Sequence, residues 1–166
     1  MKQSLALLFP LFFLCISCAS KFGITKAQAF TRENVTGTIQ VDDNGRPGNS
    51  GIYKNYIIYI ETKADTLLPK FETAWIEGKG YFINPIEVKN ELRLGKTKDD
   101  KEVVMNAGNG KKLWQLVLSP NAPVLPDSSL TEKMKKDPIV LTGEWKNKPF
   151  EYSIKKVQEL ETSFGQ

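Results

Sequence analysis

Short apolar runs separated by clusters of turn residues dominate the chain from residue 31 onward, and this pattern restricts it to a β-rich fold. The run NYIIYIET at 55–62 is rich in β-branched and aromatic side chains, and both of its faces are largely apolar. It therefore predicts a central strand. About eight such runs, separated by turn clusters, predict a single antiparallel β-sandwich or barrel.

Hairpins and one short helix are expected within this fold. Paired alternating runs predict hairpins at 71–83, 102–119 and 139–154. Pro85 follows the first of them and predicts an edge or a bulge there, because proline cannot donate a ladder hydrogen bond. A helix is expected near 128–137, where Ser129 and Glu132 have the spacing of a capping box.

The N-terminal end of the chain differs from the rest. Lys2 precedes an apolar run from Leu5 to Ser17 that Pro10 interrupts. A membrane-spanning helix needs about 20 apolar residues, so this run is too short to be one. Its length and its positive start predict the hydrophobic region of a secretory signal peptide.

The end of the apolar run resembles the lipobox of bacterial lipoproteins. In CISC, residues 15–18, the small residue Ser17 precedes Cys18, although Cys15 stands where the family usually has leucine. The resemblance implies cleavage between Ser17 and Cys18 and lipidation of Cys18. The domains expected from it are a signal peptide (1–17), a lipid anchor and tether (18–32), a β-rich domain (33–160) and a tail (161–166).

The location of the protein follows from the same resemblance. Surface-exported lipoproteins of Bacteroidota-like bacteria often carry acidic residues just after the cysteine, whereas no acid precedes Glu33 here. The resemblance therefore implies an anchor in the cell envelope, on the periplasmic face of the outer membrane. Ordinary secretion is the alternative, with cleavage after Ala19 or at the small-x-small sequence of 27–29.

Residue types exclude several kinds of chemistry. The chain has no histidine, and Cys15 and Cys18 are its only thiols. Ser-His-Asp and Cys-His catalytic sites and histidine metal sites are therefore excluded within this chain. We expect no metal and no cofactor. A pair of carboxylates, as glycosidases use, stays open because the chain has 19 Asp and Glu residues.

Two segments come close to ligand-binding loops without matching them. The sequence GKT at 95–97 ends like a phosphate-binding loop, but Asn90 stands where the first glycine is needed. The sequence DDNG at 42–45 begins like a calcium loop, but Tyr53 or Lys54 stands where the closing glutamate is needed. A charged turn is the better interpretation of the first. Calcium binding on a loop is a minor alternative for the second.

The charge pattern gives no sign of a nucleic-acid partner. The net charge is +4, and most basic residues lie near acidic ones in the sequence. No basic stripe is interleaved with aromatic residues, as in proteins that bind RNA.

Three tryptophans, Trp75, Trp114 and Trp145, fall in expected strands. Packing in the core is one interpretation, since each shares a strand face with apolar side chains. A platform for a glycan or a peptide is the other.

The sequence does not identify an activity. Without histidine, we expect a non-enzymatic binding or assembly module at the membrane, with an envelope protein or a glycan as partner. One alternative is a carrier of a small ligand or lipid, in which four inward side chains line a void: Tyr56, Ile58, Leu116 and Leu141. The other is a carbohydrate-active enzyme that uses two carboxylates.

Overall fold

Strands form nearly all of the regular structure. The computed structural model describes residues 22–35, 52–120 and 125–164. The elements are, in chain order, β1 (Ile24–Val35), β2 (Ile52–Lys63), β3 (Lys70–Ile76), β4 (Lys79–Val88), β5 (Leu92–Lys96), β6 (Glu102–Met105), β7 (Lys111–Pro120), α1 (Ser128–Met134), β8 (Ile139–Trp145), β9 (Lys148–Ile154), β10 (Val157–Glu159) and β11 (Ser163–Phe164).

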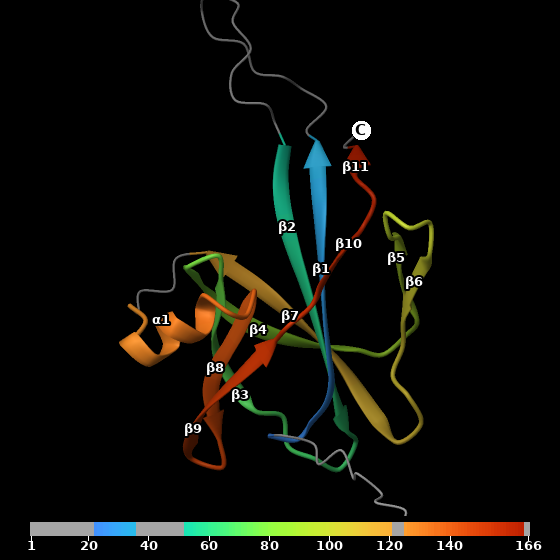
Figure 1. Ribbon diagram of the computed structural model, residues 1–166. Coiled ribbons are helices and arrows are strands. Elements are labelled where there is room, and N and C mark those ends of the chain that lie inside the picture. The colour runs from blue at the N-terminus through green and yellow to red at the C-terminus, as the bar shows by residue number, and fades with distance from the viewer. Residues whose placement is uncertain (1–21, 36–51, 121–124, 165–166) are drawn as a thin grey trace, which may run out of the picture.

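One curled sheet forms the body of the protein. Its strand order is β10-β1-β2-β7-β4-β3-β8-β9, with β11 also pairing with β1, and it curls into a half-barrel (Figure 1). The pairs are antiparallel except that β10 and β11 run parallel to β1. Strands β5 and β6 form a separate sheet of their own. The all-β prediction with one short helix is therefore confirmed.

The concave face of the sheet is filled by apolar side chains. Its cluster draws on β1, β2, β3, β7, β8 and β9, and three of the residues expected to line a void belong to it. Ile58 and Leu141 are fully buried, and Leu116 is 1% exposed. Tight packing of these side chains stabilises the curl through the burial of apolar surface.

The β5–β6 hairpin covers the convex face of β1, β2 and β7. Phe30 and Tyr59 lie beneath it, with ring centroids 6.4 Å apart in an edge-to-face arrangement. Arg32 donates a hydrogen bond to the carbonyl of Leu94 and ties the hairpin to β1. Strand β2 therefore faces apolar clusters on both sides, which confirms its prediction as a central strand.

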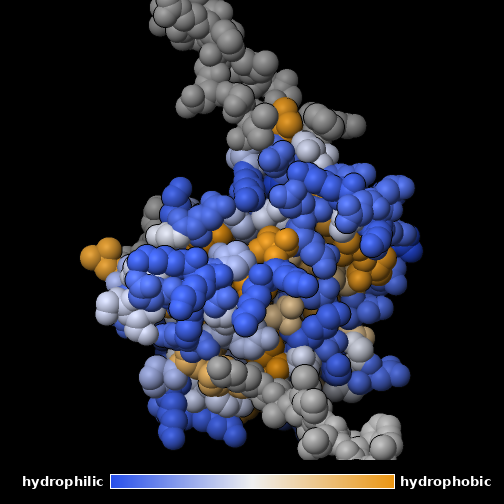
Figure 2. All heavy atoms as spheres, in the orientation of Figure 1, coloured by the Kyte–Doolittle hydropathy of each residue, from blue (hydrophilic) through white to orange (hydrophobic). Residues whose placement is uncertain are grey.

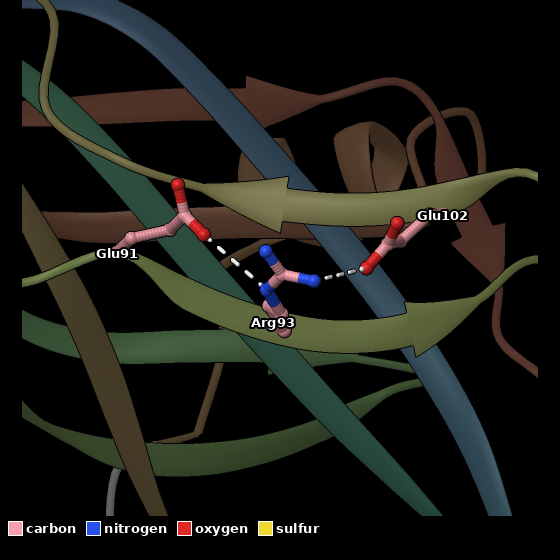
Figure 3. A network of polar contacts seen from close by, with 3 residues as sticks. All are labelled: Glu91, Arg93 and Glu102. Atoms are coloured by element: carbon pink, nitrogen blue, oxygen red, sulfur yellow. Dashed lines mark hydrogen bonds and ion pairs between the residues drawn. The ribbon is translucent and has the colours of Figure 1, made fainter.

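An exposed ion network crosses the outside of the same hairpin, and most of the surface on the side of the molecule seen in Figure 2 is hydrophilic. Arg93 lies between Glu91, at 3.3 Å, and Glu102, at 3.2 Å (Figure 3). The Arg93 side chain is 69% exposed, so water screens both pairs and their contribution to stability is at most about 1 kcal/mol. Burial beneath the hairpin, rather than this network, holds it in place.

Helix α1 covers the convex face of β3 and β8. Leu130 and Met134 pack against Trp75 and Val140. The helix lies within the expected range, but its N-cap is Asp127, not Ser129. The Asp127 carboxylate accepts a hydrogen bond from the backbone N–H of Leu130 at 2.7 Å and so satisfies one N–H group of the first turn. The helix therefore has its N-cap two residues earlier than predicted.

Two of the three expected hairpins are confirmed, as β3–β4 and β8–β9. The hairpin at 102–119 is wrong: β6 pairs with β5, whereas β7 pairs with β2 and β4. The reason is that β7 is apolar on both faces. Leu113 lies in the convex cluster and Leu116 in the concave one, so β7 is stable only inside the main sheet.

Pro85 occupies an edge position inside β4. Strand β3 pairs with β4 only from Lys79 to Phe82, so beyond Phe82 only β7 pairs with β4 among the described strands. Pro85 therefore needs no donor on the side away from β7.

The ends of the domain differ from the expected boundaries. Strand β1 begins at Ile24, inside the expected tether, and β11 lies inside the expected tail and pairs with β1. Segment 24–32 belongs to the sheet because Ala29 and Phe30 enter its concave and convex clusters in turn. Ser17, Cys18, the leader and the turn cluster at 42–51 lie outside the described residues.

Candidate functional site

Strands β2 and β7 separate into a fork at one end of the half-barrel. Their pairing runs from Lys63 and Lys111 to Ile58 and Leu116, where it stops. Beyond this pair, residues 52–57 of β2 still pair with β1, and residues 117–120 of β7 still pair with β4. The two edges that face each other have no partner strand in the described part of the chain. Figure 1 shows β2 continuing straight while β7 bends away.

A groove of about 420 Å³ lies between the arms of the fork. Because side chains alternate along a strand, each arm contributes to both faces of the groove. Tyr56, Tyr81 and Leu118 pack at the border of the concave core. Ile57 and Val117 line the groove from the convex side. Apolar side chains therefore line both faces of the groove, and Lys54, Asn55 and Gln115 add polar groups to its lining.

Three polar side chains close the mouth of the half-barrel beside this groove. The Tyr56 hydroxyl donates to Oε1 of Glu77 at 2.5 Å, and Lys54 Nζ lies 3.3 Å from the same oxygen. Lys54 Nζ is also 5.2 Å from the centroid of the Tyr56 ring. We call Lys54, Tyr56 and Glu77 the mouth cluster. It joins β2 to the β3–β4 turn across the open end of the curled sheet.

The backbone conformation of Glu77 suggests that this residue is present for its side-chain contacts rather than for the turn. Glu77 and Gly78 form the tight turn between β3 and β4, with φ of +49° and +77°. Such turns favour Asn-Gly, because a side chain other than Asn or Asp rarely adopts positive φ. Glutamate is therefore an unfavourable choice for the turn itself. Its carboxylate contacts with Tyr56 and Lys54 explain its presence there.

The three groups of the mouth cluster hold their usual charges at neutral pH. Burial and the hydrogen bond to Glu77 raise the pKa of Tyr56, so the phenol stays protonated. The hydrogen bond from Tyr56, followed by that from Lys54, lowers the pKa of Glu77. The hydrogen bond with Tyr56 raises the pKa of Lys54. Each pKa moves away from neutrality, which suits recognition rather than proton transfer.

A second and larger groove lies beside α1. Its volume is about 590 Å³, and its lining includes Trp75 and the carboxylates of Glu72, Asp127 and Glu151. Each carboxylate has a partner: these are Lys70 at 3.4 Å, the backbone N–H of Leu130, and Lys133. The groove therefore offers acids, but each already makes a structural contact.

The structure does not bring the three tryptophans together. Trp75 is 4% exposed beneath α1, and its Nε1 has no hydrogen-bond partner among the described residues. Trp114, on β7, donates to Thr62 at 3.1 Å. Trp145 is five residues beyond Val140, the residue that pairs with Trp75, which places it about 16 Å further along β8. They do not form one surface.

Sequence reasoning did not find the mouth cluster as a unit. It named Tyr56 as an inward-facing residue but missed Lys54 and Glu77. The available signal was glutamate before glycine in a tight hairpin turn. The GKT segment does not form a phosphate-binding loop in the described structure, since Gly95 and Lys96 lie in β5 and Thr97 forms a bridge with Leu160.

Comparisons with known protein families, with curated proteins and with solved structures found no match. Among the described residues, no helix is long and apolar enough to cross a membrane. Within the same ranges, no group of three or more Cys, Asp or Glu side chains is arranged to hold a metal ion.

Proposed function

We propose that this protein is a non-enzymatic binding module that takes up an extended segment of an envelope protein as an added strand. The segment enters the fork between β2 and β7. The observation that carries the proposal is that two strand edges face each other across a groove with apolar side chains on both of its faces. Unpaired strand edges are templates for another strand, and several peptide-binding domains work in this way.

The fork supplies both parts of such recognition. Residues 52–57 of β2 pair with β1 on one side, so about half of their backbone groups, roughly six, point to the open side. These groups give affinity without sequence preference. The groove walls give specificity, because alternate side chains of an added strand meet Tyr56 and Leu118 on one face and Val117 on the other. We expect an alternating, mainly apolar segment.

The two other functions receive less support. A carrier needs a void behind Ile58, Leu116 and Leu141, but these side chains are packed in the concave cluster. A carboxylate-dependent enzyme needs two free acids in a cleft, whereas the acids beside α1 are each engaged. A platform of tryptophans for a glycan would need them on one surface, whereas Trp75 is buried and lies about 16 Å from Trp145 along the sheet.

We further propose that a lipid on Cys18 holds the protein at the periplasmic face of the outer membrane, with secretion as the alternative. Two or three acyl chains, as lipoproteins carry, give stable anchoring, whereas one is marginal. Incorporation of labelled palmitate in the producing bacterium tests this. The label should be lost in Cys18→Ser, and label that persists in this variant would refute the assignment of Cys18.

Selection of random ten-residue peptides displayed on phage tests the binding function. The full chain is the target, and two variants are its controls. Val117→Lys places a charge in the groove, whereas Ile86→Lys places the same charge on the same convex sheet face, at an exposed residue outside the groove. Peptides selected by the parent chain should bind Ile86→Lys equally and should lose binding to Val117→Lys.

Backbone methylation of a selected peptide separates strand addition from side-chain binding alone. We expect the added strand to pair with the longer edge, residues 52–57 of β2, while β7 contributes side chains, so alternate N–H groups of the added strand point to β2. N-methylation at every second position should abolish binding, and methylation at the positions between should be tolerated. Equal effects at all positions, or unchanged binding to Val117→Lys, would contradict the proposal.

A further inference from the structure

The end of the half-barrel opposite the fork gathers the first described residues and two connections. A Cβ at Gly23 would lie 2.6 Å from Thr66 in the β2–β3 connection and 3.0 Å from the ring of Trp145. The amide of Ala64 donates to the carbonyl of Gly110 at 2.9 Å, so the segment before β7 lies at this end too. Figure 1 shows these connections together at the lower end. We call this the basal end.

Basic and apolar side chains stand together at the basal end. Lys63, Lys146 and Lys148 are exposed, and none forms an ion pair with another residue in the described ranges. Leu67, in the connection that follows Lys63, is 80% exposed. Trp145 is half-buried, and Lys146 Nζ lies 5.5 Å from its ring centroid. These five residues form the basal patch.

The backbone at Lys146 supports a role for its side chain. Lys146 and Asn147 form the tight turn between β8 and β9, with φ of +51° and +60°. Asparagine or glycine is favoured at both positions of such a turn, and lysine is not. A lysine therefore stands at the tip of this hairpin although the geometry of the turn disfavours it.

The length of chain between Cys18 and the sheet limits how far this end can be from a lipid anchor. Four residue steps separate Cys18 from Phe22, and a fully extended chain covers at most about 14 Å in four steps. Phe22 is fixed to the domain, with its ring centroid 5.0 Å from that of Phe150. Because β1 begins at Ile24, a lipid on Cys18 would be joined to the sheet by only a short tether.

We infer that the basal patch is a contact surface for an anionic phospholipid bilayer, so that the fork points away from the membrane. This inference rests on the proposed lipid at Cys18. Lysines attract anionic headgroups within about a Debye length, roughly 10 Å, which is comparable with the reach of the chain. Tryptophan is favoured at the interface between hydrocarbon and water. Leu67 supplies apolar surface at the same level.

Cosedimentation with vesicles tests the patch without the lipid. The chain from residue 18 onward with Cys18→Ser contains every described residue. The probe is vesicles of phosphatidylglycerol and phosphatidylethanolamine, with phosphatidylcholine vesicles for comparison. Lys146→Glu with Lys148→Glu should weaken binding to the anionic vesicles by about tenfold or more. The matched control is Lys155→Glu with Lys156→Glu, an equal charge change at the other end of β9, which should bind as the parent does.

Tryptophan quenching by brominated lipids tests the orientation of the lipidated protein in the same vesicles. Quenching should fall in Trp145→Phe but need not vanish, because Trp75 is buried beneath α1 whereas Trp114, hydrogen-bonded to Thr62, is only partly buried. Undiminished quenching in this variant, equal loss of binding in both lysine pairs, or no binding to anionic vesicles would overturn the inference. Palmitate labelling reports on Cys18 separately. Label without vesicle binding refutes the patch alone, and patch-dependent binding without label refutes the anchor alone.

Discussion

The mouth cluster makes a measurable prediction about what holds the half-barrel curled. Tyr56→Phe removes one hydroxyl, and Glu77→Gln removes one charge while keeping its shape. A hydrogen bond to a charged group contributes about 1.5–3 kcal/mol when it is buried. The Glu77 side chain is 65% exposed, so solvent reduces this value. We expect a coupling free energy between the two residues of about 0.5–1 kcal/mol.

Urea unfolding of the parent, both single variants and the double variant at neutral pH measures this coupling. Each single variant should be less stable than the parent, and the double variant should lose less than the sum of the two. Residues that do not interact add to within about 0.3–0.5 kcal/mol. Because glutamine can still accept the hydrogen bond from Tyr56, a coupling below that limit would show that the charge of Glu77 does not strengthen its contact with Tyr56.

The coupling should also depend on pH in a defined direction. The hydrogen bond from Tyr56, then Lys54, and more weakly the charge of Lys79, lower the pKa of Glu77 from 4.5. A lowered pKa means that the folded state favours the carboxylate, so this stabilisation is present above pH 4.5 and is lost as the pH falls through the folded pKa. The difference in stability between the parent and Glu77→Gln should therefore shrink in acid. A difference that grows in acid would contradict the assignment.

Three further substitutions test other parts of the fold by urea unfolding. Phe30→Ala should cost about 3–5 kcal/mol, whereas a residue in a tether would cost nothing. Gly143→Ala should cost about 3 kcal/mol, because the new Cβ would lie 2.1 Å from the carbonyl oxygen of Lys70, and a cost near zero would refute that close contact. Asp127→Ala should cost about 1 kcal/mol through loss of the N-cap, and an unchanged stability would argue against it.

The strand that the sequence predicts best is one in which the side chains of both faces are apolar. In β2, alternate residues enter the concave and convex clusters, so its apolar run leaves little ambiguity about type or burial. The β3–β4 and β8–β9 hairpins are also readable. Their strands are adjacent in sequence and their connections are short.

Pairing between distant strands is harder to predict from local pattern. Strand β7 follows β6 in sequence but pairs with β2 and β4, because both of its faces need apolar neighbours. Strand β6 instead finds its partner in β5. Consecutive strands are neighbours only about two times in three, so a hairpin assumption fails where a strand is inserted between others.

The mouth cluster was hidden for a related reason. Lys54 and Glu77 are 23 residues apart, and only the curl of the sheet brings the β3–β4 turn to β2. Polarity and spacing do not encode that contact. The only local sign of the contact is that Glu77 has a positive φ, which glutamate rarely adopts. In the sequence this sign appears as a glutamate before glycine in a hairpin turn.

Strand β1 connects the fold to the interpretation of the leader. Cleavage at the small-x-small sequence would leave Phe30 as the first residue, and would remove Ile24 and Ala29 from the concave cluster. Ala29 pairs with Ile58 on one side and Val157 on the other, so the sheet would lose a strand segment between β2 and β10. Cleavage before Cys18 or after Ala19 leaves β1 whole. Of these two, only cleavage before Cys18 leaves a lipid within about 14 Å of Phe22, which is the geometry that the basal patch requires.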